Sequence, residues 1–219
     1  MPRLKVRCIA DADEAWTAIR LGADALGLVS AMPSGPGVID EAQIAAVAAV
    51  VPPPVATFLL TSAQDADAIV EQQRCCRTNT LQLCDALPEG DHARLRAALP
   101  GIALVQVIHV EGEASVDEAL AVAPHVDALL LDSGRPSAAT KELGGTGRTH
   151  DWTLSRTIRE RASVPVFLAG GLRVENVADA VRQVRPFGVD LCSGVRTDGR
   201  LDAAKLARFV AALRSVPAD

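Results

Sequence analysis

The residues of this chain best suited to acid–base and phosphate chemistry lie in its second half. Asp132 directly follows the apolar run 129–131. A carboxyl group at the end of a buried strand can exchange a proton with a ligand or contact it. Glycine-rich clusters follow, and their unhindered backbone N–H groups can approach an anion closely. The clusters cover residues 144–147, 170–171 and 193–194.

The elements that position these residues form a regular series. Short, continuous apolar runs predict strands buried on both faces, and the alanine-rich segments between them predict helices. The expected strands cover residues 4–9, 25–29, 55–60, 80–83, 104–109, 128–131, 166–169 and 189–191. The expected helices cover residues 13–21, 40–51, 63–73, 92–99, 116–122, 152–161, 174–183 and 203–213.

Strict alternation of strands and helices predicts parallel strands joined by right-handed crossovers. Eight such units in 219 residues fit a compact (β/α)8 TIM barrel, and we expect residues 1–219 to form that one domain. An open, doubly wound sheet is the alternative, but no GxGxxG motif follows the first strand. In a barrel the glycine clusters would meet on the catalytic face, where phosphate commonly binds after strands 7 and 8.

Composition excludes several classes of protein. Apolar residues make up 49% and charged residues 22% of the chain, which excludes disordered and fibrous proteins. The net charge of −5 and the aromatic content of 3% predict no nucleic-acid partner. Prolines interrupt the longest apolar run, so no membrane span is expected. The five cysteines form no metal or disulfide pattern, and we expect reduced thiols in a cytoplasmic protein.

Six segments carry a resemblance to a known family over nearly the whole chain. They are 22–27 (GADALG), 129–132 (LLLD), 144–152 (GGTGRTHDW), 168–172 (LAGGL), 175–177 (ENV) and 184–195 (VRPFGVDLCSGV). They resemble phosphoribosylanthranilate isomerase, a TIM barrel of tryptophan biosynthesis. The resemblance implies an Amadori rearrangement, in which an aminated phosphoribose ring opens and an aldose becomes a ketose. It also implies that neither a metal nor an organic cofactor is needed.

The resemblance assigns roles to individual residues. The acid that protonates the ring oxygen matches Asp132. Lys5 matches a family position two residues before the base, and Gln82 matches the first residue of the family's Gln-Leu-His-Gly motif on strand 4. The phosphate-binding loops match Gly145, Gly147, Gly170, Gly171, Ser193 and Gly194.

The first strand departs from the family at the base, a cysteine in a Lys-x-Cys-Gly motif. This chain has Lys5-Val6-Arg7-Cys8. Without a gap Arg7 takes the cysteine position, and with the glycine deleted Cys8 takes it. Because side chains alternate along a strand, the alignments predict different sites. Arg7 could hold an anion but cannot be a base at neutral pH, whereas Cys8 could supply a thiolate. The ungapped alignment is favoured because it keeps Lys5 in place.

The half of the site that would hold the aromatic acid also departs from the family. The loop 33–37 lacks the family's carboxylate-binding arginine, His109 replaces an arginine, and Arg196 replaces an acidic residue. His109 could shuttle protons or simply end a strand.

We therefore predict an aldose–ketose isomerase, an intramolecular oxidoreductase, that acts as a monomer or homodimer on a small phosphorylated sugar amine. The substrate would be phosphoribosylanthranilate or a relative with another aglycone. The alternatives are a barrel with altered chemistry on a phosphorylated ligand, in which Arg7 and His109 are the active residues, and a non-catalytic phosphate-binding relative.

Overall fold

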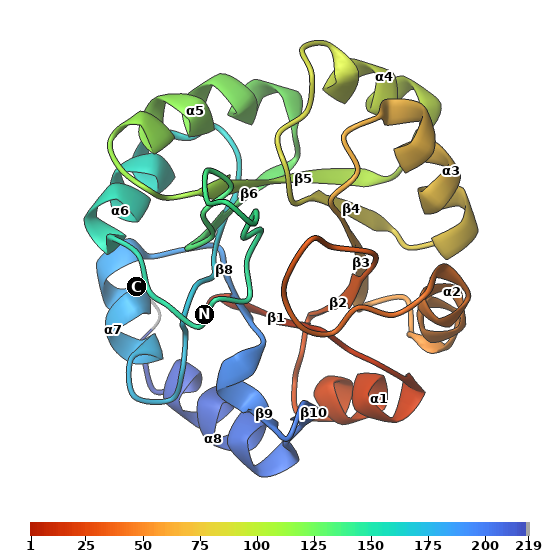
Figure 1. The fold of residues 1–219 in the computed structure, drawn as a ribbon. Helices are drawn as coiled ribbons and strands as arrows, with labels where there is room; N and C mark the ends of the chain where they lie inside the picture. The colour runs from red at the N-terminus through yellow and green to blue at the C-terminus, as the bar shows by residue number, and fades with distance from the viewer. Residues whose placement is uncertain (218–219) are drawn as a thin grey trace.

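The strands of the computed structural model, which describes residues 1–217, close into a parallel barrel surrounded by helices (Figure 1). Each strand pairs with the next along the chain, and the last returns to the first through pairs such as Leu4 with Val189. This closure confirms the TIM barrel and excludes the open sheet. The strands are β1 (Arg3–Arg7), β2 (Ala25–Val29), β3 (Ala56–Thr61), β4 (Thr80–Leu83), β5 (Ala103–His109), β6 (Ala128–Asp132), β7 (Val166–Leu168) and β8 (Gly188–Leu191).

The helices alternate with the strands as predicted. They are α1 (Ala12–Arg20), α2 (Glu41–Val50), α3 (Ala66–Cys76), α4 (Asp91–Ala98), α5 (Ala114–Val122), α6 (Trp152–Arg161), α7 (Val177–Val184) and α8 (Ala203–Arg214). Two short 3-10 helices, η1 (Ala123–His125) and η2 (Ser193–Val195), and a hairpin of β9 (Arg196–Thr197) and β10 (Arg200–Leu201) complete the set. No helix within residues 1–217 is both long enough and apolar enough to cross a membrane.

Two helices begin three residues later than the sequence predicts, and in each case a side chain sets the boundary. The carboxylate of Asp65 accepts a hydrogen bond from the backbone N–H of Ala68, so that α3 begins at Ala66. The backbone N–H of Arg173 donates to the side chain of Asn176, and this turn delays α7.

The core has two layers because strand side chains alternate between the barrel interior and the helices. On β3, Phe58 and Leu60 belong to the interior cluster, whereas Leu59 packs in the outer cluster with helix residues such as Ile44. The outer layer is apolar. The interior layer also holds charged side chains, and two of them, Arg7 and Asp132, are the last residues of their strands.

The segments after β2 and β6 meet over that end of the barrel (Figure 1). The hydroxyl of Ser34 donates to the carbonyl of Lys141 at 2.8 Å. Gly145 lies so close to Pro36 that a β-carbon on Gly145 would be 2.8 Å from the proline Cδ. These two loops therefore cover the barrel mouth.

Candidate active site

Four charged side chains form a connected set of ion pairs inside the barrel. Lys5 Nζ donates to Gln82 Oε1 and to Asp190 Oδ1, both at 2.9 Å. Arg7 Nη2 donates to Asp132 Oδ2 at 3.1 Å, and Arg7 Nε lies 3.4 Å from Asp190 Oδ2. All four charged groups are buried, so each requires an opposite charge nearby. Two cations and two carboxylates leave this layer with no formal net charge.

The inward position of Arg7 follows from the two-residue period of β1. Leu4 and Val6 pack between the barrel and the helices, so Lys5 and Arg7 point inward, as the ungapped alignment predicts. Burial opposes the charge of Arg7, but Asp132 and Asp190 raise its pKa above its ordinary value. Arg7 therefore stays protonated and cannot accept a proton.

Cys8 also faces the barrel mouth, which corrects the expectation that only one of the two residues could do so. β1 ends at Arg7, and Cys8 has a left-handed backbone with φ of +65°, so the strand alternation stops before it. The Cys8 sulfur lies 3.4 Å from the Pro36 carbonyl oxygen and 2.7 Å from the sulfur of Cys192. Arg7 and Cys8 line one cavity of about 20 Å³ beneath the two covering loops.

Asp132 lies at the end of β6, directly under the covering loop that follows this strand. Its Oδ1 accepts a hydrogen bond from the backbone N–H of Ser133 at 2.7 Å, and its Oδ2 accepts from Arg7. Gly144, which lines the cavity with Arg7 and Cys8, has φ of +121°, and a β-carbon there would lie 2.5 Å from Asp132 Oδ2. Glycine thus lets the loop close over the carboxylate.

The predicted phosphate-binding residues lie on the loops after β6, β7 and β8. All but one of them lie where these loops pack against one another. A β-carbon on Gly171 would lie 2.6 Å from the Arg148 carbonyl carbon, and one on Gly194 would lie 2.4 Å from the Leu172 carbonyl oxygen. Gly147 lies near the Ser193 hydroxyl, and Gly170 packs against Ser133 and His150. The exception is Gly145, which contacts Pro36 in the loop after β2.

His109 is not brought to the cavity of Arg7 and Cys8. Its Nε2 lies 3.0 Å from the Cys84 carbonyl oxygen, and its Nδ1 is buried without a hydrogen-bond partner among residues 1–217. It lines a separate cavity of about 400 Å³, beside Glu111 and Glu118. His109 therefore lies at a different cavity from Arg7, the other active residue of the alternative in which the barrel performs altered chemistry.

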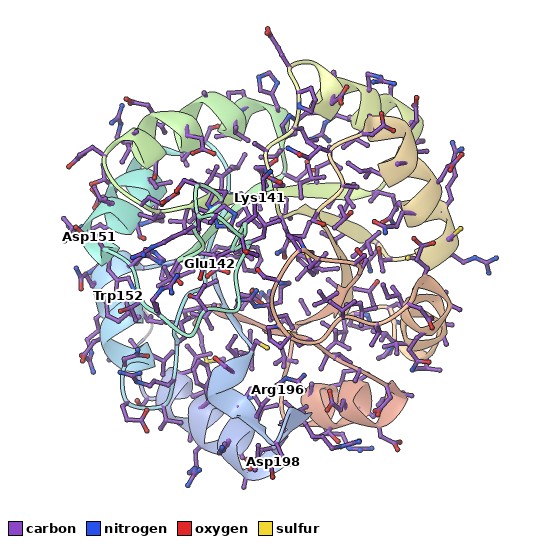
Figure 2. All side chains as sticks on the ribbon, in the orientation of Figure 1. Lys141, Glu142, Asp151, Trp152, Arg196 and Asp198 are labelled. Carbon is purple, nitrogen blue, oxygen red and sulfur yellow. The ribbon has the colours of Figure 1, made fainter. Side chains whose placement is uncertain are left out.

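Sequence reasoning assigned no role to Cys192, and it gave Arg196 only as a departure from the family. Arg196 lies beside α1 (Figure 2), where its Nη2 is 3.2 Å from Glu14 Oε2 and also donates to the carbonyl of Cys8. It therefore holds the end of β1. The signal for Cys192 was its place directly before Ser193 in a phosphate-loop motif.

The thiols of Cys8 and Cys192 titrate as a pair. A hydrogen bond from Cys8 lowers the pKa of Cys192 below its ordinary value; burial opposes this shift, and Arg7 and Arg196 support it. The same hydrogen bond, together with burial, raises the pKa of Cys8. The pair therefore loses its first proton more readily, and its second less readily, than ordinary thiols do.

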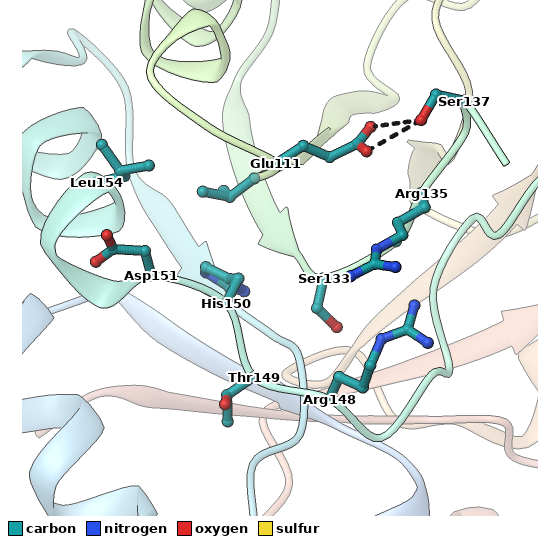
Figure 3. Close-up of a pocket in the computed structure, with 11 residues that line it drawn as sticks. Glu111, Ser133, Arg135, Ser137, Arg148, Thr149, His150, Asp151 and Leu154 are labelled. Carbon is teal, nitrogen blue, oxygen red and sulfur yellow. Dashed lines mark hydrogen bonds between the residues drawn. The ribbon is translucent and has the colours of Figure 1, made fainter.

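A larger cavity of about 540 Å³ lies along the loop that joins β6 to α6 (Figure 3). Its lining includes Arg135, Arg148, His150 and Glu111, and Glu111 accepts a hydrogen bond from Ser137. Arg7, Cys8 and Asp132 do not line it. Among residues 1–217 no group of three or more histidines, cysteines and acids is arranged to hold a metal ion.

Comparison with known proteins supports the resemblance that the sequence motifs carry. The family model for N-(5'-phosphoribosyl)anthranilate isomerase matches residues 4–212. The N-(5'-phosphoribosyl)anthranilate isomerase of Halorubrum lacusprofundi is 39% identical over 213 residues, which cover 96% of each chain.

Solved structures agree with this result. Phosphoribosyl anthranilate isomerase from Thermotoga maritima is 27% identical, with a TM-score of 0.84 over 98% of this chain and 99% of that one. A phosphoribosyl anthranilate isomerase in complex with reduced 1-(o-carboxyphenylamino)-1-deoxyribulose 5-phosphate is 26% identical, with a TM-score of 0.81 and the same coverage. The chain therefore belongs to the N-(5'-phosphoribosyl)anthranilate isomerase family.

Proposed function

We propose that this protein catalyses the Amadori rearrangement of phosphoribosylanthranilate, as an aldose–ketose isomerase of tryptophan biosynthesis. The observation that carries the proposal is the position of an acid and a thiol at the same barrel mouth. Cys8 lines the cavity there, and Asp132 lies directly beneath Gly144, which lines it too. Family membership supplies the reaction that such a pair performs.

The reaction needs a proton donor and a proton acceptor on one sugar. Asp132 takes part in its protonated form, which it reaches when Arg7 no longer occupies Oδ2. It gives this proton to the ring oxygen as the ring opens, and the amine nitrogen forms a double bond to the first carbon, which leaves an iminium cation. Cys8 removes a proton from the second carbon, whose electrons form the double bond of an enolamine. Tautomerisation of the enolamine gives the ketose. Atoms balance without any cofactor.

Arg7 supplies the positive charge that the loop after β2 lacks. Its guanidinium lies between Asp132 and Asp190 and lines the cavity. A carboxylate on the bound aglycone offers this group a second anionic acceptor, in the planar geometry that arginine favours. A shift of Arg7 toward that carboxylate frees Asp132 Oδ2 for the ring oxygen.

The phosphate would lie at the loops after β6, β7 and β8, where Gly147, Gly170, Gly171, Ser193 and Gly194 gather. A cavity of about 20 Å³ holds no sugar phosphate, so the loops after β2 and β6 must separate when substrate enters. We also propose that the protein is cytoplasmic and that residues 1–219 form one domain. It would act as a monomer or homodimer.

Turnover of freshly prepared phosphoribosylanthranilate by the purified protein tests this function. We expect turnover by the native chain and by Asp117→Asn, an exposed carboxyl on α5. Asp132→Asn keeps the shape but loses the proton, and we expect kcat to fall at least about 100-fold. A folded protein that binds inorganic phosphate but does not turn this substrate over would overturn the proposal and favour another phosphorylated ligand.

A further inference from the structure

The ends of β1 and β8 bring two thiols into contact beside the cavity. Val6 pairs with Leu191, so the chain segments that continue to Cys8 and Cys192 leave the barrel together. The left-handed backbone of Cys8 turns its side chain toward Cys192, and the sulfur atoms lie 2.7 Å apart. Both residues are at least nine-tenths buried, with exposed fractions of 3% and 5%.

The charges around this thiol pair favour one negative charge on it. Arg7 on β1 and Arg196 on β9 support a thiolate, whereas Asp190 on β8 opposes it. Arg196 is held in place by Glu14 on α1, and Arg7 is held by Asp132 on β6. Two adjacent buried sulfurs cannot both be ionised, because like charges at this distance repel strongly. One proton between the two sulfurs satisfies both, as the S–H of one donates to the thiolate of the other.

We propose that Cys192 is a positioning residue for the isomerisation, because it shares a single proton with Cys8 and keeps Cys8 able to accept a proton from the substrate. The inference rests on the proposed function and deepens it. As Cys8 removes the proton from the second sugar carbon, the shared proton moves to Cys192. The C–H electrons become the new double bond, and the pair changes from one proton to two. No oxidant or reductant takes part.

Other groups near the mouth are less suited to this role. Arg7 stays protonated, and burial raises the pKa of Cys84 to about 12. His109 lies at a different cavity. The carboxylates of Asp132 and Asp190 are already held by Arg7 and Lys5. Cys8, which lines the cavity and contacts Cys192 behind it, therefore remains as the proton acceptor.

The ultraviolet absorbance of thiolates during a pH titration tests the shared proton without any substrate. In the native protein we expect one thiolate to appear with a midpoint clearly below that of an ordinary thiol. Cys192→Ala should raise the midpoint of the first ionisation by at least about one unit, because the one thiolate that can still form at this place has lost its thiol donor. Cys192→Ser keeps a donor and should give an intermediate midpoint. Cys75→Ser, which removes an exposed cysteine on α3, should lose the absorbance of that one thiol and leave the midpoint of the first ionisation unchanged.

The pH profile of kcat/KM tests whether this shared proton matters to the reaction. A rise of one unit in the midpoint should lower kcat/KM about tenfold on the acid limb, with recovery at higher pH. Damage to the fold would lower activity at every pH and would not recover. Cys192→Ser should regain part of the loss.

The outcomes separate the two proposals. A native midpoint near that of an ordinary thiol, or equal midpoints and pH profiles in native and Cys192→Ala protein, overturns the shared proton even if turnover is normal. The native midpoint does not depend on either variant folding. A lowered native midpoint that rises in Cys192→Ala, in a protein with no turnover, supports the shared proton and overturns only the proposed substrate.

Discussion

At the scale of single residues, the interior charges of the barrel do two tasks at once. In the ungapped alignment Arg7 takes the position of the family's base, yet an arginine cannot act as one. Instead it compensates Asp132 and Asp190, which lie buried on β6 and β8. A buried carboxylate without a cation is strongly destabilising. Arg7 is thus needed for the fold as well as for the proposed contact with the aglycone.

Arg7→Met should therefore destabilise the whole protein. The substitution keeps much of the side-chain volume but leaves Asp132 without its cation, and we expect the free energy of unfolding to fall by about 3–5 kcal/mol. Equilibrium unfolding in urea measures this change. Arg161→Met, at an exposed position in the last turn of α6, is the control and should stay within about 0.5 kcal/mol of the native protein. A similarly small effect at Arg7 would contradict its role as the compensating charge.

At the scale of elements, the loops after the strands create the site by close approach of their backbones. Gly171 has φ of +59°, and the loop that joins β6 to α6 passes so near that a β-carbon would lie 2.6 Å from the Arg148 carbonyl carbon. Gly101, between α4 and β5, also has positive φ, but no atom lies within 4 Å of its β-carbon position. Alanine variants of these two glycines therefore distinguish the effect of backbone strain from the effect of crowding by a neighbouring loop.

Gly171→Ala should weaken phosphate binding, whereas Gly101→Ala should not. Both alanines strain the backbone by about 1–2 kcal/mol, but only the first pushes the β7 loop from its neighbour. Inorganic phosphate at 100 times its dissociation constant stabilises a binding protein by about 2.7 kcal/mol, which raises the melting temperature. We expect this rise in the native protein and in Gly101→Ala, and its loss in Gly171→Ala. An equal rise in both variants would place the phosphate elsewhere.

At the scale of the whole molecule, stability depends on groups that folding removes from water. His150, at the end of the loop before α6, has its Nε2 2.7 Å from the Ser155 hydroxyl oxygen, and its Nδ1 is buried without a hydrogen-bond partner in residues 1–217. Burial lowers the pKa of His150 below its ordinary value of 6.5, although Asp132 and Asp151 oppose this shift. The folded protein therefore binds this proton less readily than the unfolded chain does.

The free energy of unfolding should therefore depend on pH through His150. Its contribution is fully present above pH 6.5 and is lost as the pH falls from there through the folded-state pKa, because the unfolded chain takes up the proton first. His150→Gln should flatten the fall in stability over this range, and urea unfolding at a series of pH values measures it. His125→Gln, at an exposed position, is the control. Parallel curves for the native protein and His150→Gln would refute the prediction.

The sequence by itself determined the barrel, because the apolar runs and the alternation of strands with helices can be recognised from residues that are neighbours along the chain. The apolar runs predicted every strand of the closed sheet, and strict alternation with helices left a parallel barrel as the favoured topology. Helix starts were less predictable, since caps such as Asp65 compete with other polar residues nearby. Motifs also placed Asp132 and most of the glycines on one face.

Only the tertiary structure decided how the ends of β1 and β8 are arranged. The two-residue period predicted that Arg7 and Cys8 face opposite ways, but the period holds only within a strand. β1 ends at Arg7, and the left-handed turn at Cys8 brings both residues to the mouth. The contact between Cys8 and Cys192 joins residues that are 184 positions apart in the sequence, and no local sequence pattern predicts a contact over such a separation. Closure of the barrel creates that contact, and with it the proposed base.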